Sequence, residues 1–583
     1  KMSENKNALL AIVLSVIIIM LFEVLYSGSG RDNNLESEIT EDTSSISETE
    51  ITKSAENLPV PKIKKSSSGI SLEGSVPKNR EESVRIKINS LKLKGSINLT
   101  GMRIDDLQLI EYKTDLDENS PDVTVLFPPN DTSGFFLQTG WVGETNDISL
   151  PDKNTQWLSD EDEISSNKSV RLTWDNGKKI LFEQNIHLDD NYVFSITQRV
   201  VNNSSREIKI FPYGLISRKG TPETLGFFIL HEGPVGVVND QLKEIDYDEL
   251  KENEKFNEVA KGGWMGFTDK YWLTSFMLPQ NRSAEVRAFH TVDEIKEDIY
   301  QIDYLLSQKS IKPGQEVETI TRFFVGPKSI ELLDSYSEEF SIPKFDLAID
   351  FGWFYFLTKP LFYLMKFLYG IIGNYGVVIL AITAIIRILL FPLANKQFSS
   401  MNHMKAVQPE IVKLRERFAD DKARLNQEMM KLYKEKKINP AAGCLPIFIQ
   451  IPIFFALYKV LFVAIEMRQA PFFGWITDLS VPDPTSMFNL FGLLPFTPPD
   501  FLSIGVWPLL MGLSMFIQQK LSPTPPDPIQ AKVFMFLPIF FTILLANFPS
   551  GLVIYWFFNN VLSIAQQSYL MKFSSKAKPQ VNQ

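Results

Sequence analysis

The sequence predicts an α-helical polytopic membrane protein, with six transmembrane helices and a large β-sandwich domain that follows the first of them. Apolar residues gather at the N-terminus and again beyond residue 350, whereas residues 27 to 350 are polar and acidic. The mean hydropathy of -0.04 and the 22% of charged residues therefore average over two different environments. A chain of 583 residues has room for a soluble domain and a membrane domain.

The first predicted span lies within residues 1–26, where Ala8 to Tyr26 form an almost unbroken apolar run. This run is long enough to cross a bilayer. A cleaved signal peptide is the alternative, because Ser27-Gly28-Ser29-Gly30 offers small residues for cleavage. We prefer a retained anchor, since the apolar core of a signal peptide is only about 7 to 15 residues long. Residues 27–79 are rich in Ser, Thr, Glu and Asp and predict a disordered linker.

Residues 80–345 predict the β-sandwich. Apolar and polar residues alternate in several segments, which is typical of half-buried antiparallel strands. Turn signals such as Asp175-Asn-Gly177 separate them. A helix is expected near Lys328 to Phe340, at the end of the domain. The clearest alternating segments are Val84 to Ile88, Leu91 to Lys94, Tyr192 to Val201 and Glu207 to Phe211.

This domain shows no sequence motif for catalysis. His187, His231 and His290 are far apart in sequence, and we find no metal-ligand spacing, nucleophile elbow or phosphate-binding loop. We therefore predict no catalytic residue, metal or cofactor. Two carboxylates that converge in the fold, as in a glycosidase, remain an alternative.

The predicted membrane domain begins with an interfacial amphipathic helix in residues 346–375, where Lys359, Tyr363 and Lys366 share one face. The second transmembrane helix is expected in residues 376–395. Transmembrane helices three to six are expected in residues 441–573, from the apolar regions Leu445 to Ile465, Ile504 to Ile517, Val533 to Ala546 and Leu552 to Leu570.

Lys and Arg residues predict the orientation of these helices. Residues 396–440 contain eleven basic residues against six acidic ones, whereas Gln469 to Ser503 contain no Lys or Arg. The basic loop and the tail of residues 574–583 are thus expected in the cytoplasm of a bacterium. Both termini are then cytoplasmic, and the β domain lies in the periplasm.

Arg387 is the most informative residue of the predicted spans. A charged side chain at the centre of a span costs about 2.5 to 3.5 kcal/mol and usually faces a cavity or a partner. Thr383 lies one turn earlier on the same helical face. In the alternative interpretation, Arg387 reaches past Pro392 to the cytoplasmic headgroups. Position in the sequence does not decide between the two.

Further polar residues favour the first interpretation. Tyr555 and Asn559 lie at helical spacing in the last predicted span, and Gln450 lies in the third. Taken singly, such residues are more often contacts between helices than the lining of a pathway. Together, one cation and several neutral polar residues fit a shallow hydrated groove better than an ion-transport site, which usually contains acidic residues.

The basic loop predicts a helical hairpin, because it contains two amphipathic segments separated by Asp420-Asp421. A solvated loop attracted to anionic lipid is the simpler interpretation. A mobile cap that receives other proteins is the functional one, since apolar faces rich in Met adapt to varied partners. The residues selected for this role are Met401, Met404, Lys405, Arg415, Arg417 and Met429.

Several long motifs resemble the YidC/Oxa/Alb family of membrane insertases. The segment from Asn439 to Tyr458 resembles the signature third core span of that family, and Phe548-Pro-Ser-Gly-Leu-Val-Ile-Tyr-Trp556 and Arg468-Gln-Ala-Pro471 match it too. The similarity covers residues 350 to 570 in the family's order. The β domain, with Lys261-Gly-Gly-Trp264, resembles the bacterial form.

This resemblance implies a five-helix core with a positively charged groove, open to cytoplasm and lipid, in which Arg387 receives hydrophilic parts of a substrate. Thr383, Tyr555 and Trp556 occupy the family's groove positions. Trp556 replaces the usual tyrosine, so a hydrogen-bonding role at this position is in doubt. Ala442 likewise replaces a glycine.

The implied partners are nascent membrane proteins, the Sec translocon (SecYEG and SecDF), the signal recognition particle and its receptor, the ribosome and membrane lipid, without nucleic-acid specificity. The implied activity is insertion and folding of membrane proteins without an enzymatic reaction. A secondary transporter with a periplasmic binding domain is the main alternative. A membrane-anchored carbohydrate-binding or carbohydrate-processing protein is the third.

Overall fold

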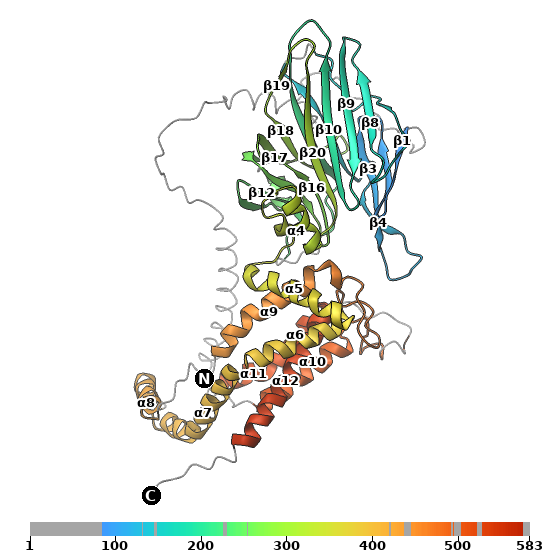
Figure 1. Cartoon of the computed structure of the whole chain (residues 1–583). Helices are drawn as coiled ribbons and strands as arrows, with labels where there is room; N and C mark the ends of the chain where they lie inside the picture. The colour runs from blue at the N-terminus through green and yellow to red at the C-terminus, as the bar shows by residue number, and fades with distance from the viewer. Residues whose placement is uncertain are drawn as a thin grey trace.

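The computed structural model describes residues 84–130, 132–144, 148–224, 230–252, 255–418, 421–436, 445–490, 494, 503–521 and 528–574. The predicted anchor, the linker, Cys444 and the tail beyond residue 574 lie outside the described residues. A β domain lies at one end of the molecule and a group of helices at the other, with a helical hairpin projecting from the helices (Figure 1).

The β domain consists of two large sheets, in which nearly all neighbouring strands are antiparallel. The first sheet has the order β14-β17-β18-β11-β5-β3-β2-β1-β7, with β19 paired to β11 and β4 paired to β3. Its strands are β1 (Arg85–Asn89), β2 (Leu93–Asn98), β3 (Arg103–Lys113), β4 (Asp122–Leu126), β5 (Gly134–Gly143), β7 (Glu163–Ile164), β11 (Ile208–Lys219), β14 (Phe256–Lys261), β17 (Ser283–Val292), β18 (Asp298–Leu306) and β19 (Lys309–Ile311).

The second sheet has the order β13-β12-β15-β16-β20-β10-β9-β8-β6. Its strands are β6 (Leu158–Ser159), β8 (Val170–Asp175), β9 (Ile180–Leu188), β10 (Val193–Asn202), β12 (Gly233–Val238), β13 (Gln241–Glu244), β15 (Gly263–Thr268), β16 (Trp272–Met277) and β20 (Glu316–Pro327). A short helix, α3 (Tyr247–Lys251), follows β13.

The two sheets pack face to face, which confirms the predicted sandwich. In β10, buried and half-buried residues alternate as the sequence pattern predicts. Aromatic rings join the sheets: the centroids of Phe276 and Tyr304 are 4.8 Å apart, and those of Phe135 and Phe267 are 5.8 Å apart. These rings contribute much of the apolar area that holds the domain together.

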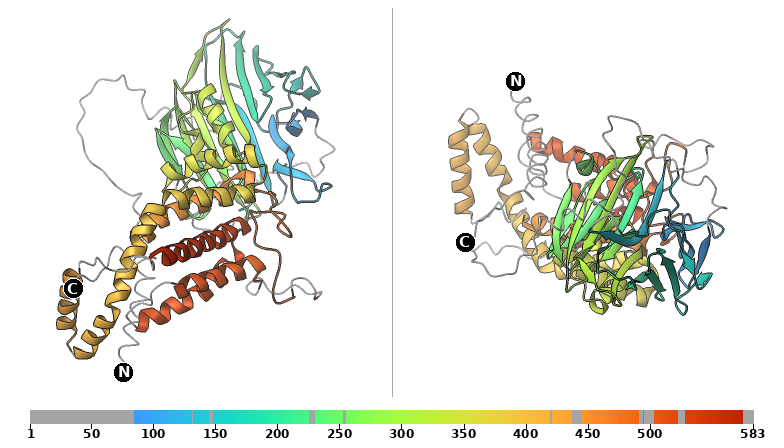
Figure 2. Two further views of the ribbon diagram at one scale, coloured as in Figure 1. Left: turned by 60° about the horizontal axis from the view of Figure 1, so that its bottom comes forward. Right: turned by 90° about the horizontal axis from the view of Figure 1, so that it is seen from above.

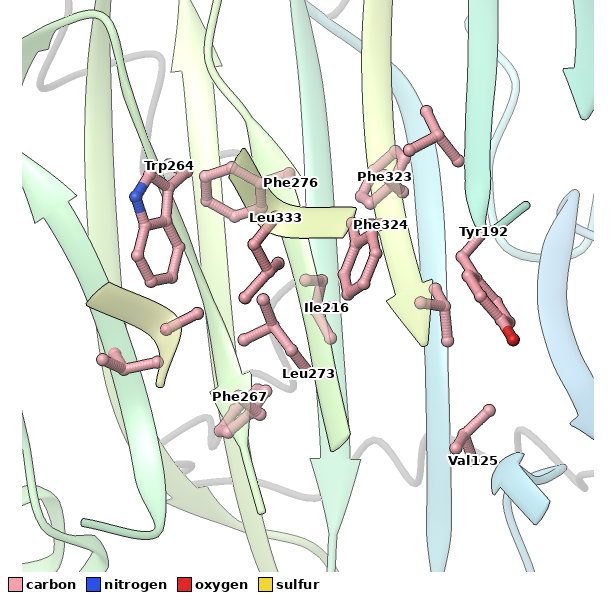
Figure 3. Close-up of a cluster of buried hydrophobic side chains, with 14 of the residues drawn as sticks. Val125, Tyr192, Ile216, Trp264, Phe267, Leu273, Phe276, Phe323, Phe324 and Leu333 are labelled. Atoms are coloured by element: carbon pink, nitrogen blue, oxygen red, sulfur yellow. The ribbon is translucent and has the colours of Figure 1, made fainter. Parts of the chain in front are cut away.

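Two helical segments cover one end of this core, α4 (Ile330–Glu339) and the single turn η1 (Phe345–Ala348). Leu333 of α4 lies over the cluster that contains Phe324 and Trp264 (Figure 3). The ring of Phe345 lies 5.6 Å from that of Phe324 and 5.3 Å from that of Trp264. The predicted helix at the end of the domain is therefore present, and it completes the core.

Eight longer helices follow the β domain in the described part of the chain. α6 gives way to α7 at Leu390, before the boundary predicted at residue 396, so residues 391–395 belong to the hairpin. The helices are α5 (Tyr355–Ile372), α6 (Tyr375–Leu389), α7 (Phe391–Arg417), α8 (Lys422–Glu435), α9 (Leu445–Val463), α10 (Val506–Leu521), α11 (Pro528–Leu544) and α12 (Ser550–Ser574), of which α7 and α8 form the projecting hairpin (Figure 2).

The polar face predicted for residues 346–375 belongs to α5, and it contacts the β domain. Lys359 pairs with Asp346 at 2.7 Å and with Asp334 at 3.2 Å. Lys366 pairs with Glu331 of α4 at 2.5 Å, and Tyr363 donates a hydrogen bond to Asp334. The apolar side of this segment is exposed, as the side chains of Trp353, Phe356, Phe367 and Ile371 show.

The loop after α9 supplies the N-terminal cap of α10. The buried Asp483 accepts hydrogen bonds from the backbone N–H of Trp507 at 2.9 Å and from the Trp475 indole N–H at 3.0 Å. Thr485 Oγ1 accepts the N–H of Val506 at 3.0 Å. Gly505 permits this approach, because a Cβ there would lie 2.5 Å from Asp483 Cγ.

No helix in the described part of the chain combines the length and the hydropathy that a membrane span requires. The count of six spans therefore stays a prediction.

We predict that Lys328→Met removes a pH dependence of stability. Lys328 is buried, and its Nζ donates to Thr268 Oγ1 at 2.8 Å. Burial lowers the pKa of Lys328 from 10.5 to about 8, although Asp350 acts in the opposite direction. The unfolded chain therefore binds more protons between these values, and the free energy of unfolding rises with pH by up to about 1.4 kcal/mol per pH unit.

The measurement is thermal unfolding of the full chain from pH 8 to pH 10.5, monitored by circular dichroism. The wild type is compared with Lys328→Met, and Lys178→Met, which changes an exposed lysine, is the control. Relative to the wild type, Lys328→Met should be stabilised most at the lower pH, because there the wild-type chain must release the Lys328 proton or bury the charge when it folds. In the variant, Thr268 keeps its hydrogen bond to the Asp269 carbonyl. Parallel curves for the wild type and Lys328→Met would contradict the prediction.

We also predict that Asp483→Ala destabilises the helical part by about 1 to 2 kcal/mol, as the loss of a helix cap does. The change removes the acceptor for the Trp507 N–H and for the Trp475 indole N–H. Thermal unfolding in detergent, followed by tryptophan fluorescence, measures the effect. An unchanged Tm would show that the loop holds α10 without this carboxylate.

Candidate functional site

Arg387 lies in the last turn of α6. The helix begins at Asn374, whose side chain accepts the N–H of Val377 at 3.1 Å, and runs through an apolar sequence to Leu389. Arg387 is half-buried, whereas the next residues, Ile388 and Leu389, are more than two-thirds exposed. The guanidinium therefore faces the other helices, and the apolar side chains face outward.

The partner of Arg387 is Asn559 of α12. Arg387 Nε donates to Asn559 Oδ1 at 2.9 Å, and Arg387 Nη2 donates to the Asn559 carbonyl at 3.2 Å. Ser563 Oγ donates to the same carbonyl at 2.7 Å. This bidentate contact holds the Arg387 side chain against α12.

Gln450 and Tyr555 extend this site to a third helix. Gln450 of α9 donates from Nε2 to the Tyr555 hydroxyl at 3.3 Å, and Tyr555 lies one turn before Asn559 on α12. We call Arg387, Gln450, Tyr555 and Asn559 the polar cluster. Residues from α6, α9 and α12, far apart in sequence, thus come together.

Trp556 and Thr383 lie beside the polar cluster but make different contacts. The Trp556 ring packs against Phe454 of α9, with centroids 4.8 Å apart, and against Phe541 of α11 at 5.3 Å. Thr383 is 1% exposed and donates to the Ile379 carbonyl of its own helix at 2.6 Å. Trp556 therefore contributes an aromatic surface, and Thr383 contributes packing.

The charge of the polar cluster is positive. Within the described part of the chain, no carboxylate forms an ion pair with Arg387. Its guanidinium is held by neutral oxygens of Asn559, which orient the cation without neutralising it. Such a site can attract an anionic group, and it contains no nucleophile paired with a base.

The predicted helical hairpin is formed by α7 and α8. Val407, Ile411 and Leu432 are its buried centre, and Met429 packs against them. Arg415 is half-buried and Arg417 exposed, with the Arg417 guanidinium near the Phe418 ring. The side chains of Met401, Met404 and Lys405 lie outside the described residues.

The sequence analysis missed the polar residues that join the β domain to α9. Lys459 forms a 2.7 Å ion pair with Asp350, and both side chains are mostly buried. The signal was a single lysine within the apolar run Leu445 to Ile465. Arg468, interpreted from the sequence as interfacial, donates to the carbonyls of Lys113 and Thr114 in the β domain.

Two family comparisons cover most of the chain. Residues 85–364 match the family described as YidC periplasmic domain. Residues 367–578 match the family described as 60Kd inner membrane protein. The boundary between them falls within α5.

Curated relatives match nearly the whole chain. The membrane protein insertase YidC of Rickettsia felis is 51% identical over 492 residues, which cover 84% of this chain and 88% of that protein. The protein of the same name from Rickettsia bellii is 49% identical over 512 residues, covering 87% and 91% respectively.

Solved structures are more distant. An active YidC insertase with its first transmembrane domain resolved is 16% identical, with a TM-score of 0.34 over 83% of this chain and 92% of that one. A galactose mutarotase related enzyme from Lactobacillus acidophilus is 12% identical, with a TM-score of 0.31 over 42% and 97%. Scores this low add nothing to the assignment.

The relatives also decide between the functional classes considered from the sequence. The two named above are insertases, which are not enzymes, and neither the transporter nor the carbohydrate-binding alternative gains support. The family matches, the high identity and the coverage agree with the motifs around Arg468 and Trp556. This chain belongs to the YidC family of membrane protein insertases.

Proposed function

We propose that this chain inserts nascent membrane proteins through a hydrated groove lined by the polar cluster, with Thr383 and Trp556 in its wall. The observation that carries this proposal is the arrangement of Arg387. Its guanidinium is oriented by Asn559, has a tyrosine hydroxyl nearby and pairs with no carboxylate in the described part of the chain. A site of this kind is suited to receive an acidic or polar segment for a short time.

Electrostatic attraction and hydrophobic transfer together supply the driving force. Arg387 attracts acidic residues more strongly in a partly dehydrated site than it would in water. A groove that contains water shortens the apolar distance that a polar segment must cross. The apolar helix of the substrate then enters lipid, and the free energy of that transfer makes insertion favourable without hydrolysis of a nucleotide.

The proposed topology has six spans, with both termini in the cytoplasm and the β domain in the periplasm. The distribution of Lys and Arg supports this orientation, since residues 396–440 are basic and residues 469–503 contain no basic residue. The exposed apolar residues of α5, among them Phe356 and Phe367, suit the outer membrane–water interface.

The α7–α8 hairpin is proposed to receive substrates and targeting factors on the cytoplasmic side. Its small apolar centre and its basic surface support a mobile element that also contacts anionic lipid. The Sec translocon, the signal recognition particle with its receptor, and the ribosome are the partners that the family resemblance implies.

We predict that Arg387→Ala slows insertion of substrates with acidic translocated tails at least several-fold, because the attracting charge is lost. Arg387→Lys should retain most of the activity, since the charge remains. The measurement is protease protection of such a substrate in proteoliposomes. Lys520→Ala is the matched control, because Lys520 is an exposed cation on α10 that takes no part in the polar cluster. Equal insertion by Arg387→Ala and the wild type would refute the requirement.

We also predict that a photocrosslinking residue at Trp556 captures nascent membrane proteins on stalled ribosomes. Trp556 is half-buried beside the polar cluster, whereas Thr383 is 1% exposed, so a probe at 383 should crosslink less. A probe at the exposed Leu158 of the β domain is the control. Solute uptake by the purified protein together with an absence of crosslinks from 556 would favour a transporter instead.

A further inference from the structure

Asp350 joins three separate parts of the molecule. It follows η1, at the end of the β domain. Its Oδ2 accepts the backbone N–H of His231, which precedes β12, at 3.2 Å, and its Oδ1 accepts the N–H of Gly352 at 3.0 Å. The same Oδ2 lies 2.7 Å from Lys459 Nζ of α9. One carboxylate thus connects the sandwich, the segment between η1 and α5, and the helix α9.

The local backbone is shaped for this contact. Gly352 adopts φ +69°, a backbone conformation that residues other than glycine rarely adopt. A Cβ at this position would lie only 2.8 Å from Lys459 Cε, so glycine also makes room for the lysine stem. The side chain of Lys459 is 11% exposed and that of Asp350 is 18% exposed, and a pair shielded from water in this way is screened little by salt.

Further contacts hold the same end of α9 against the β domain. Lys270, in the β15–β16 turn, lies over the Phe462 ring at 4.2 Å. Arg468 donates to carbonyls at the end of β3 and lies 5.7 Å from the Trp272 ring. Gln469 donates to the Lys113 carbonyl at 3.3 Å. These contacts come from two further segments of the β domain, the end of β3 and residues 270–272, so together with Asp350 they limit both sliding and rotation of α9.

The other end of α9 belongs to the proposed groove. Phe454 and Lys459 are five residues apart on one helix, which separates them by about 7.5 Å along its axis. Phe454 contacts Trp556, and Gln450, one turn earlier, donates to Tyr555. A shift of α9 at Lys459 must therefore change the position of both groove residues relative to α12.

We infer that Asp350 and Lys459 are positioning residues for insertion: their ion pair anchors α9 to the β domain and thereby sets the spacing of the groove between α9 and α12. This inference rests on the proposed function for its link to activity. Its structural part, the placement of α9 by the pair, is measured independently of activity.

The test uses the full chain in proteoliposomes, with Cys444 replaced by serine and two pairs of spin labels. The first pair, at Leu158 and Lys520, reports the position of the β domain relative to the helices. The second pair, at the exposed Ile451 and Val561, reports the spacing of α9 and α12. Lys459→Met should broaden both distance distributions and slow insertion several-fold, whereas Lys459→Arg should restore both.

A double-mutant cycle distinguishes the loss of the Asp350–Lys459 ion pair from destabilisation that either substitution causes by itself. Asp350→Asn keeps one oxygen as an acceptor for one of the two backbone N–H groups and loses the charge. The double variant Asp350→Asn, Lys459→Met should be no more impaired than Lys459→Met alone, because it removes the Asp350 charge that the single change leaves without its lysine. Lys209→Met, which breaks the 3.2 Å pair with Glu144 beside β19, at the end of the β domain away from the helices (Figure 1), is the control and should change neither distance.

Additive effects of the two substitutions, or an unchanged 451–561 distance in Lys459→Met, would overturn the inference. Where Lys459→Met fails to fold, Arg468→Gln, which cuts a separate contact of the same junction, should broaden the same distances. If Arg387→Ala inserts substrates normally while Lys459→Met still broadens the 451–561 distance, the groove proposal fails and the anchoring of α9 stands.

Discussion

The arrangement of the molecule depends on how one carboxylate, that of Asp350, satisfies its hydrogen-bonding capacity. A carboxylate removed from water needs donors, and Asp350 obtains them from His231, Gly352 and Lys459. Because these donors lie in the sandwich, in the segment between η1 and α5, and in α9, satisfying one buried charge also fixes the position of the β domain relative to the helices. Breaking such a pair leaves the other charge buried, which makes the joint sensitive to single changes.

The helix α5 shows how the same chain serves two environments. Its basic residues, Lys359 and Lys366, form ion pairs with acidic residues of α4 and η1. Its opposite face presents large apolar side chains such as Phe367. The helix is thereby attached to the β domain on one side and exposes apolar side chains on the other, as the proposed interfacial role requires.

The cation of the polar cluster is paired differently from the cations at the junction between the β domain and α9. At the junction, cations meet carboxylates or ring faces, and the contacts stabilise the fold. In the polar cluster, Arg387 meets only the neutral oxygens of Asn559 among the described residues, so its charge is oriented but available. This difference separates the structural cations of the junction from Arg387, for which substrate binding is proposed.

The sequence alone was enough to predict the strand pattern of the β domain, the unusual charge of Arg387, the family and the hairpin. Alternation in Tyr192 to Val201 predicted β10, since period two follows directly from strand geometry, and Arg387 was recognisable as an unusual charge in an apolar run. The family was recognisable from the motif around Tyr555 and Trp556. The hairpin was predicted from two amphipathic segments, which are local patterns.

Only the tertiary structure decided which polar residues meet. Asn559 was a candidate by spacing, but its bond to Arg387 requires α6 and α12 to pack side by side. Asp350 and Lys459 have no local signature as a pair, because their contact depends on where the sandwich rests on α9. Periodicity reports which face of an element is apolar, whereas a partner across the chain is chosen by packing, which no single segment of the sequence contains.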